Sequence, residues 1–317
     1  MALTVLGLAL IAGQADFGPR SAAIDAVPDV LRGLLGTVIV FGLCGFGLVR
    51  LLLPEVLRRF ELLWVAPVGG CTAGLALTLL GFAGVPYAVS LSLLLVAGAG
   101  AGVYAVRRRG WPQAPRALGW PLFLALVVLG VCLIPVFAQH YAAVVGNGSD
   151  AHEAAGVAQF LQHAYPTSVD VGAPVNQMPS TWQSKFPIYY AFAAVSSVSG
   201  LATWQLLPIL AAAMLALAAG GMFLLATEVL SAPLTIAAAG TGLACLDRMA
   251  LHTVLNPYFN QTWGFFAMPF TLVLGWCAVA PGLGRAARRG ALALLVLFAL
   301  VLVFAYPLAA PIPAVPL

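Results

Sequence analysis

Residues 203–228 read TWQLLPILAAAMLALAAGGMFLLATE, and this stretch decides the class of fold. Its one charged residue, Glu228, stands at the very end. A helix needs about 20 mostly apolar residues to cross the hydrocarbon core of a bilayer, so the stretch predicts a membrane-spanning helix. The whole chain agrees, because 62% of its 317 residues are hydrophobic and 8% are charged. One soluble domain cannot bury that much apolar surface.

Other apolar runs of spanning length accompany this stretch, and residues 2–13 form a further, shorter one. We therefore predict an all-α fold, a polytopic transmembrane helical bundle of about nine spans. Small-residue pairs four apart, Gly70 with Gly74 and Gly98 with Gly102, suit close helix packing in lipid. The predicted long spans cover roughly residues 30–50, 62–84, 86–106, 119–138, 203–228, 233–250, 263–281 and 290–310.

A polar segment, residues 139–186, interrupts the apolar pattern. We expect chemistry on a polar substrate to take place there, because the chain has few other polar residues to offer. The apolar run 187–200 that follows is too short to span, so we predict a juxtamembrane or re-entrant helix. Residues 1–138 then form a region of N-terminal spans, and residues 139–317 a second region with the loop 139–200 and further spans. The segment holds the only lysine, three of the ten acids and three of the four histidines: Lys185, Asp150, Glu153, Asp170, His140, His152 and His163.

The arginines predict the orientation, because basic residues of short loops are held on the cytoplasmic side. If residues 139–186 are external, seven of the ten acids also lie outside. The net charge of +4 then reflects topology and indicates no nucleic-acid partner. The bias toward Ala, Leu, Gly and Arg is typical of a bacterial chain, so we expect the plasma membrane with the active loop external. Ten of the fourteen basic residues are then cytoplasmic: Arg50, Arg58, Arg59, Arg107, Arg108, Arg109, Arg116, Arg285, Arg288 and Arg289.

The acids Asp150 and Glu153 begin a predicted amphipathic helix that lies along the membrane surface and ends at Pro166. The two acids have two interpretations. As N-cap and third helical residue they match a capping box. Alternatively, Asp150 is a general base or a substrate ligand at the mouth of the bundle. The two are compatible, since a cap is also a rigid mount. The apolar residues of this helix recur at intervals of three and four: Ala151, Ala154, Ala158, Leu161 and Tyr165.

Residues 119–310 resemble a known superfamily in three features. These are the acid at the start of an external helix, the stretch WQSKFPIYY at 182–190 that opens a short apolar helix, and a long span that ends with LLATE at 224–228. The arrangement resembles the first large external loop and the next span of the GT-C superfamily. Its members are polytopic glycosyltransferases that use polyprenyl-phosphate sugars, including the protein O-mannosyltransferases and the aminoarabinose transferases of lipid A.

The resemblance implies that a lipid-linked sugar approaches from the bilayer and that a loop carboxylate takes the proton of an acceptor hydroxyl. Asp150 matches the position of the catalytic acid, and Glu153 or Asp170 could be the second loop acid. Lys185 is the first candidate for binding the donor phosphate. No metal is required by the sequence, although some members use a divalent ion. The residues that we expect to line the substrate are His152, Tyr189, Tyr190, Asn256 and Tyr258.

A second polar group lies between two predicted spans on the same face, in the loop 247–263. Arg248 belongs near the interface, because an arginine at the bilayer centre costs about 2.5–3.5 kcal/mol on insertion scales. In one interpretation Asp247 and Arg248 are a topological anchor among interfacial aromatic residues. In the other, Arg248 and His252 meet Lys185 around a phosphate, which arginine can bind through two hydrogen bonds.

The chain departs from the superfamily in two ways. Four or five apolar runs precede the loop, whereas the family's loop follows its first span, and the chain has fewer spans than such enzymes generally have, as a fragment or a truncated homologue would. Two other classes of function remain open. A transporter or lipid flippase would place ionisable residues along a path at mid-membrane depth. A noncatalytic membrane subunit would use the Asp150 helix only as a capped surface helix.

Overall fold

The computed structural model describes residues 26–112, 116–139, 142, 149–167 and 185–309. Every regular element in these ranges is a helix. In chain order they are α2 (Val27–Leu52), η2 (Glu55–Phe60), α3 (Glu61–Phe82), α4 (Tyr87–Arg109), η3 (Arg116–Leu118), α5 (Gly119–Ala138), α6 (Ser149–Leu161), α9 (Phe186–Ser199), α10 (Thr203–Leu224), the π-helical turn η4 (Leu225–Val229), α11 (Leu234–Cys245), α12 (Arg248–Leu255), α13 (Phe259–Val279), α14 (Arg285–Ala305) and η5 (Pro307–Ala309).

Seven of these helical stretches are long and apolar enough to cross a membrane, which confirms seven of the eight predicted long spans. Four begin earlier than predicted, at Val27, Glu55, Phe259 and Arg285. Helix α14 begins at Arg285, because arginine side chains can reach an interface while their backbone is already helical. Helix α13 begins at Phe259, so the predicted loop 247–263 is wrong in its second half. Thr262 does not break that helix, since its hydroxyl donates back to the carbonyl of Tyr258. The short run 2–13 lies outside the described residues.

The span predicted at 233–250 is instead a bent pair of helices. Helices α11 and α12 meet at an angle of 51°, and α11 alone has 12 residues. Twelve residues rise about 18 Å, less than the roughly 30 Å of a hydrocarbon core. Asp247 explains the break, because its carboxylate accepts a hydrogen bond from the Met249 backbone N–H at 2.8 Å and so caps a new helix.

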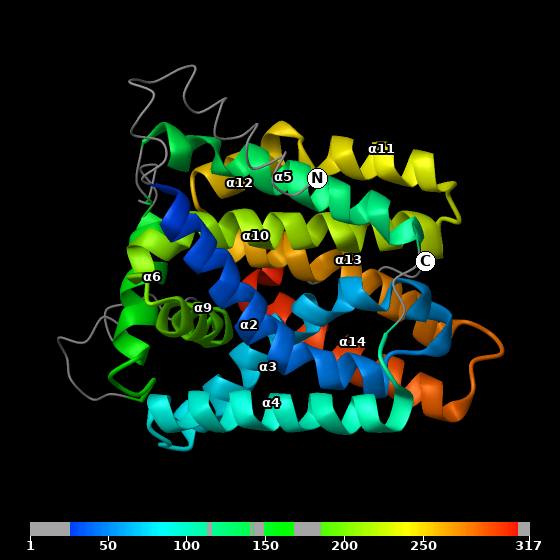
Figure 1. Cartoon of the computed structure of the whole chain (residues 1–317), viewed down its shortest axis with the longest axis horizontal. Coiled ribbons are helices and arrows are strands. Elements are labelled where there is room, and N and C mark those ends of the chain that lie inside the picture. The colour runs from blue at the N-terminus through cyan, green and yellow to red at the C-terminus, as the bar shows by residue number, and fades with distance from the viewer. Residues whose placement is uncertain (1–25, 113–115, 140–141, 143–148, 168–184, 310–317) are drawn as a thin grey trace.

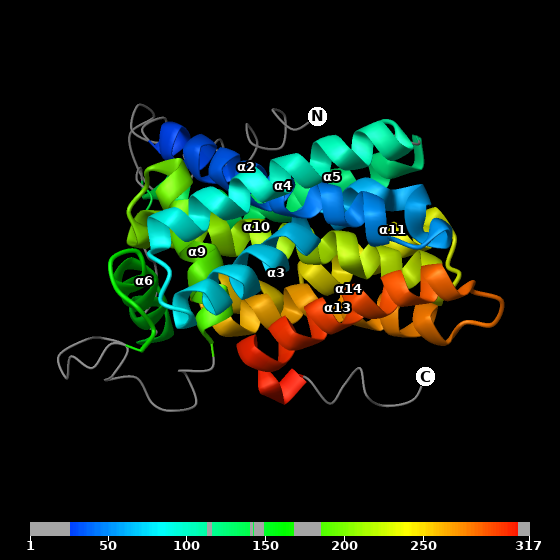
Figure 2. The ribbon, with the colours of Figure 1, turned by 90° about the horizontal axis from the view of Figure 1, so that it is seen from below.

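The long helices run side by side along one axis, with the short helices α6 and α9 across one end (Figure 1). The view turned by 90° shows the same arrangement, with α9 transverse to the long helices (Figure 2). We call this the loop end. The opposite end carries the termini of α2, α4 and α14 that hold the arginine runs, and we call it the arginine end. The two ends are those that the predicted topology places on opposite sides of the membrane.

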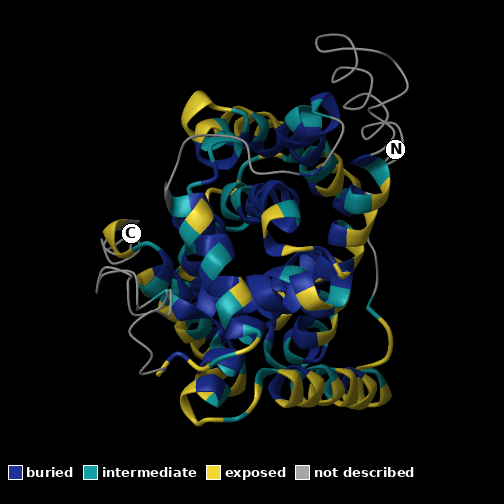
Figure 3. Ribbon diagram, turned by 90° about the vertical axis from the view of Figure 1, so that its left-hand side faces the viewer, coloured by how far each residue is buried: buried dark blue, intermediate teal, exposed yellow. Residues whose placement is uncertain are grey.

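Burial is greatest in the middle of the bundle, as the view onto the loop end shows (Figure 3). In the 18-residue apolar part of the α10 span, 78% of the residues are buried, whereas in that of α4 only 22% are buried. Helix α10 is therefore the central span, and α4 lies at the periphery with most of its surface facing outward. A helix that is apolar on all sides belongs in the core of a membrane bundle.

Helices α2 and α3 cross at very short range through two glycines. A Cβ on Gly69 would collide with the carbonyl oxygen of Phe41, and one on Gly45 with the carbonyl oxygen of Val65. The predicted glycine pairs also lie at helix contacts. Gly98 approaches the Leu43 carbonyl, Gly70 approaches the Phe41 ring, and Gly74 approaches the carbonyl of Pro187 at the start of α9. Such contacts are typical of helices that associate in lipid, where small residues let backbones approach.

A buried ion pair holds the arginine end together. Arg50 donates to Glu61 at 2.6 Å, and the pair is 8% and 5% exposed. Its second guanidinium nitrogen donates to the carbonyls of Arg109 at 2.7 Å and Gly110 at 2.6 Å, while Arg109 donates to the Arg50 carbonyl. These bonds tie α2, α3 and α4 to one another. They also satisfy the carbonyls at the end of α4, which have no partner within the helix.

Replacing Gly69 with alanine is expected to destabilise the bundle by about 1–3 kcal/mol, the range that overpacking costs. The added methyl group would meet the Phe41 carbonyl, a backbone atom that cannot rotate away. The matched control is Gly275→Ala in α13, where a Cβ would meet nothing within 4 Å. That change should be neutral or stabilising, since alanine favours a helix over glycine by about 1 kcal/mol. Thermal unfolding in detergent measures both, and equal stability of the two variants would contradict the close crossing.

Candidate functional site

Helix α6 carries Asp150 and Glu153 one turn apart, so that the two carboxylates are neighbours on the helix surface. The helix begins at Ser149, which places Asp150 in the first turn and corrects the predicted N-cap position. The negative charge still lies at the favourable end of the helix dipole. The predicted apolar face is confirmed except for Tyr165, which lies beyond the helix and is 39% exposed. The buried residues of the helix are Ala151, Ala154, Ala155, Val157, Ala158 and Leu161.

Gln162 fixes α6 against α9. The helix ends at Leu161, earlier than the predicted end at Pro166, because the chain turns there and Gln162 bonds across to the neighbouring helix. Its side-chain nitrogen lies 3.2 Å from the Ala193 carbonyl and 3.2 Å from the Ser196 hydroxyl. These contacts hold the acids of α6 in a defined position relative to α9.

Helix α9 has 14 residues and does not span, as predicted for the run 187–200. Its surroundings differ from the prediction, since it is buried along almost its whole length between α2, α3 and α6. A helix that is apolar on every face gains more from burial within a bundle than from a membrane surface. Pro187 stands in its first turn, where a proline is well tolerated, and Gly200 ends it with φ +68°.

The acids of α6 and the residues at the start of α9 form one electrostatic group. Burial raises the pKa of Asp150, and the Lys185 charge opposes that shift. Burial likewise raises the pKa of Glu153, with a further rise from the Asp150 charge and an opposing effect of Lys185. Burial lowers the pKa of Lys185, and the two carboxylates oppose that shift. The Tyr189 hydroxyl lies close enough to both carboxylates to sense their charge.

Asn260 joins this group from α13, and the sequence analysis did not select it. Its side chain is 3% exposed and faces the Tyr189 hydroxyl, but the two do not meet hydrogen-bond geometry. Among the described residues, Tyr189 Oη, Asn260 Oδ1 and Glu153 Oε2 are buried without a hydrogen-bond partner. Buried polar atoms are nearly always paired, so each exception needs an explanation, and a functional role is one of them. We call Asp150, Glu153, Lys185, Tyr189 and Asn260 the acid cluster.

The predicted residues of the second polar group form a separate set around α12. Arg248 and His252 are exposed, and Asn256 Nδ2 lies 3.1 Å from His252 Nδ1. The His252 and Tyr258 rings are tilted by 40° to each other, with centroids 5.7 Å apart. Within the described part of the chain, no hydrogen bond or ion pair joins Arg248 or His252 to Lys185. Helix α13, which follows α12, does reach the acid cluster through Asn260. It does so because it begins earlier than predicted and packs on α6.

Two further candidates lie on the elements of the cluster. Tyr190 points away from the acids, and its ring stacks on Tyr87 with centroids 6.4 Å apart. Consecutive helical residues are separated by about 100°, which is why Tyr189 and Tyr190 face different neighbours. His152 is exposed on α6, between the two acids in sequence, and makes an interaction of its own. Asp170 and His140 lie outside the described residues.

A divalent metal would find two carboxylate ligands, Asp150 and Glu153, on one turn of α6. Among the residues that the structure describes, no group of three or more His, Cys, Asp or Glu side chains could hold a metal ion. Two partly buried carboxylates and one amine can accept a proton and bind an anion, and the tyrosine and asparagine can hydrogen-bond a polar substrate.

The fold and the cluster define a class, an integral membrane protein with a polytopic helical bundle and polar residues gathered at one end. Comparison with protein-family models, with curated proteins and with solved structures gives no match.

The pKa shift of Glu153 predicts a pH-dependent stability. Its pKa is raised in the folded state, so its contribution to stability is present at low pH and is lost as the pH rises through the folded-state pKa. Glu153→Gln removes that loss. It should raise the midpoint of thermal unfolding by roughly 2 °C at about pH 8 and less at about pH 4.

The control is Glu55→Gln, since the Glu55 side chain is 83% exposed at the arginine end. It should show no comparable dependence on pH. A stabilisation by Glu153→Gln that is larger at acidic pH than at alkaline pH would contradict the predicted pH dependence. It would show that burial does not raise the pKa of Glu153.

Proposed function

We propose that this chain is an integral membrane glycosyltransferase that moves a sugar from a polyprenyl-phosphate donor to an acceptor on the external face of the membrane. The observation that carries the proposal is the acid cluster. Asp150 and Glu153 share one partly buried site with Lys185 at the end of a membrane bundle. An acid that accepts a proton and a cation that binds a phosphate are the two groups that this transfer requires.

Asp150 is the proposed general base. The acceptor hydroxyl attacks the anomeric carbon, a new carbon–oxygen bond forms, and the hydroxyl proton passes to the Asp150 carboxylate. The bond between the anomeric carbon and the phosphate oxygen breaks, and its electrons leave with the polyprenyl phosphate. Attack from the face opposite the leaving group inverts the anomeric centre. Burial favours this role, because a raised pKa makes a carboxylate a stronger base.

Lys185 is the proposed phosphate ligand, and Tyr189 and Asn260 are proposed to position the sugar or the acceptor. Lys185 precedes α9 directly, so its amine lies at the end of the bundle. Tyr189 Oη and Asn260 Oδ1 are buried without partners, and a polyhydroxylated substrate would satisfy both. Glu153 is proposed as a second acid that hydrogen-bonds the substrate through its unpaired Oε2.

The proposed orientation follows from the two ends of the bundle. The arginine end faces the cytoplasm of a bacterial cell, in agreement with the positive-inside rule, and the acid cluster lies at the external surface. A lipid-linked sugar in the outer leaflet then reaches the cluster directly from the bilayer.

A transporter is the second candidate, and the bent pair of α11 and α12 is the observation that favours it. Broken helices are common in transporters, where the exposed backbone ends bind the substrate near mid-membrane. Against this class, the carboxylate at the break, Asp247, is occupied in capping α12. The buried acid Glu61 is paired with Arg50 at the arginine end.

Asp150→Asn is expected to reduce sugar transfer by about 10²–10⁴-fold, the usual contribution of a general base. Transfer is measured with purified protein and a panel of polyprenyl-phosphate sugars, after thermal unfolding has shown equal stability. The control is Asp29→Asn, an acid in the first turn of α2 at the same end of the bundle. The wild-type pH–rate profile should lose activity below a pKa that lies above the ordinary aspartate value of about 3.9.

Equal transfer by wild type and Asp150→Asn would remove Asp150 from the mechanism. No transfer by wild type from any donor, together with uptake of a sugar lipid into vesicles, would favour the transporter.

Lys185→Gln is expected to raise the KM for the donor more than it lowers kcat, because the lysine is proposed to bind the phosphate before and during transfer. The measurement is a donor titration at saturating acceptor. Arg248→Gln is the comparison, since Arg248 is exposed on α12 and lies outside the acid cluster. If Arg248→Gln raises the donor KM more than Lys185→Gln does, the donor phosphate binds at α12 and not at Lys185.

A further inference from the structure

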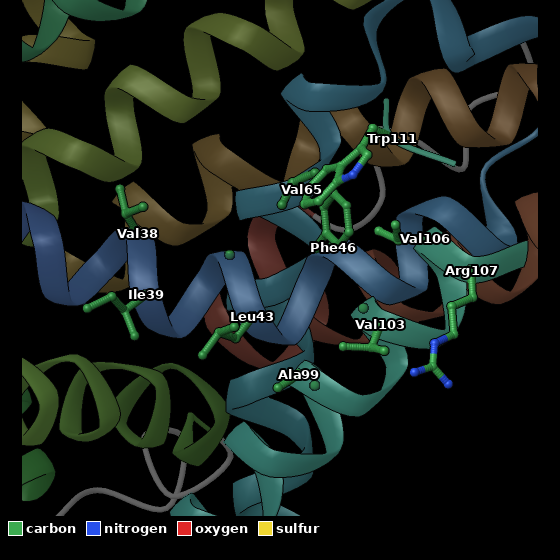
Figure 4. A pocket seen from close by; sticks show the side chains of 13 residues that line it. Val38, Ile39, Leu43, Phe46, Val65, Ala99, Val103, Val106, Arg107 and Trp111 are labelled. Atoms are coloured by element: carbon green, nitrogen blue, oxygen red, sulfur yellow. The ribbon is translucent and has the colours of Figure 1, made fainter. Parts of the chain in front are cut away.

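An apolar groove runs along the outside of the bundle between α2 and α4, and none of its lining residues belongs to the acid cluster (Figure 4). Its volume is about 750 Å³. Val38, Ile39 and Leu43 line it from α2, and Val103 and Val106 from α4. No polar side chain other than those of Arg107 and Trp111 is among its lining residues.

Glycines create the groove. Gly98 brings α4 against the backbone of α2, since a Cβ there would lie 2.7 Å from the Leu43 carbonyl oxygen. Gly42 faces the groove, and a Cβ there would meet nothing within 4 Å. Close backbone contact at one glycine and an empty position at the other leave a hollow between two helices that otherwise touch.

The charge of the groove lies at its arginine end. Arg107 and Trp111 both line that end: Figure 4 shows Trp111 beside Phe46 and the Arg107 guanidinium extending past the apolar walls. The next two arginines of the sequence form hydrogen bonds: Arg108 donates to the Tyr104 hydroxyl at 3.4 Å, and Arg109 donates to the Arg50 carbonyl. In the described part of the chain, Arg107 makes no hydrogen bond or ion pair.

On α2 the lining of the groove extends from Val38 to Phe46, a rise of about 12 Å, and it is apolar over this whole length. Apolar walls that end at an arginine match a hydrocarbon chain that carries an anionic headgroup.

We propose that this groove binds the acyl chain of an anionic phospholipid, with the lipid phosphate held by Arg107. The apolar walls select a hydrocarbon chain, and the arginine at the end of the groove selects a negative charge. Clusters of basic residues beside a membrane span are suited to anionic headgroups. The site lies at the arginine end, in the leaflet opposite the acid cluster, and does not depend on the proposed transferase activity.

The test compares lipid retention by the full chain. Protein is reconstituted with equal amounts of phosphatidylglycerol and phosphatidylcholine and extracted gently into detergent, and bound lipid is counted by native mass spectrometry. Wild type should retain phosphatidylglycerol over phosphatidylcholine by about fivefold, the ratio expected for one arginine near an anionic headgroup. Arg107→Gln should reduce that ratio to about one, whereas Arg108→Gln should leave it unchanged.

A second pair of variants tests the groove itself. Gly42→Leu places its side chain in the hollow, where the Cβ meets nothing within 4 Å, and should remove most retained lipid of both kinds. Gly100→Leu is the matched control, because it adds the same side chain on α4 at a position that is open but does not line the groove. Its lipid retention should match wild type.

Three results would overturn the proposal. These are equal retention of the two lipids by wild type, an unchanged ratio in Arg107→Gln, and unchanged retention in Gly42→Leu. The mass of the wild-type particle provides a separate check. A dimer that Gly42→Leu converts to a monomer, with no lipid lost, would assign the groove to a second copy of the chain.

Discussion

The close crossing of α2 and α3 is the contact on which much of this structure depends. Gly45 and Gly69 allow the two backbones to touch, and no side chain larger than hydrogen fits at either position. With α2 and α3 held together, their loop-end halves form the wall on which α9 packs, and α9 in turn carries Lys185 and Tyr189. The same α2 surface presents Gly42 and Leu43 to α4, which leaves the apolar groove. In lipid, where apolar burial alone gives no preference between helices, such backbone contacts determine which helices meet.

The polar residues of the chain are divided between the two ends of the bundle, and the two groups are built differently. At the arginine end, Arg50 and Glu61 bind each other and a second guanidinium nitrogen binds backbone carbonyls, while Arg50 Nε and Glu61 Oε1 are buried without a partner among the described residues. At the loop end, three polar atoms of the acid cluster are likewise buried without a partner. An unsatisfied buried polar atom costs about 1–3 kcal/mol, which a substrate that completes the hydrogen bonds can recover. The proposed chemistry is placed at the loop end because two acids and a lysine share one partly buried site there.

The sequence selected part of the acid cluster because charged residues are rare in it. Asp150, Glu153 and Lys185 stand in one polar segment and Tyr189 follows it by three residues, so their proximity could be expected from the sequence. Asn260 could not be, since it lies 71 residues after Tyr189 and reads as part of a loop. The position where α13 begins decides its role: a helix from Phe259 turns Asn260 toward α6 and α9. In the sequence, Asn260 is a polar residue at the start of an apolar run, and such a residue usually marks only the membrane–water interface.

Composition and periodicity by themselves determined that this protein is a helical bundle in a membrane, because an apolar run of about 20 residues has no other way to satisfy its backbone in lipid. They also located seven spans to within a few residues and recognised that residues 187–200 do not cross. Only the tertiary structure decided that α9 is buried inside the bundle and that the sixth predicted span is broken at Asp247. Hydropathy measures how apolar a segment is, and it contains no information on whether lipid or another helix covers it. That choice depends on contacts between residues far apart in the chain, such as those of Gly69 with Phe41 and of Gly74 with Pro187.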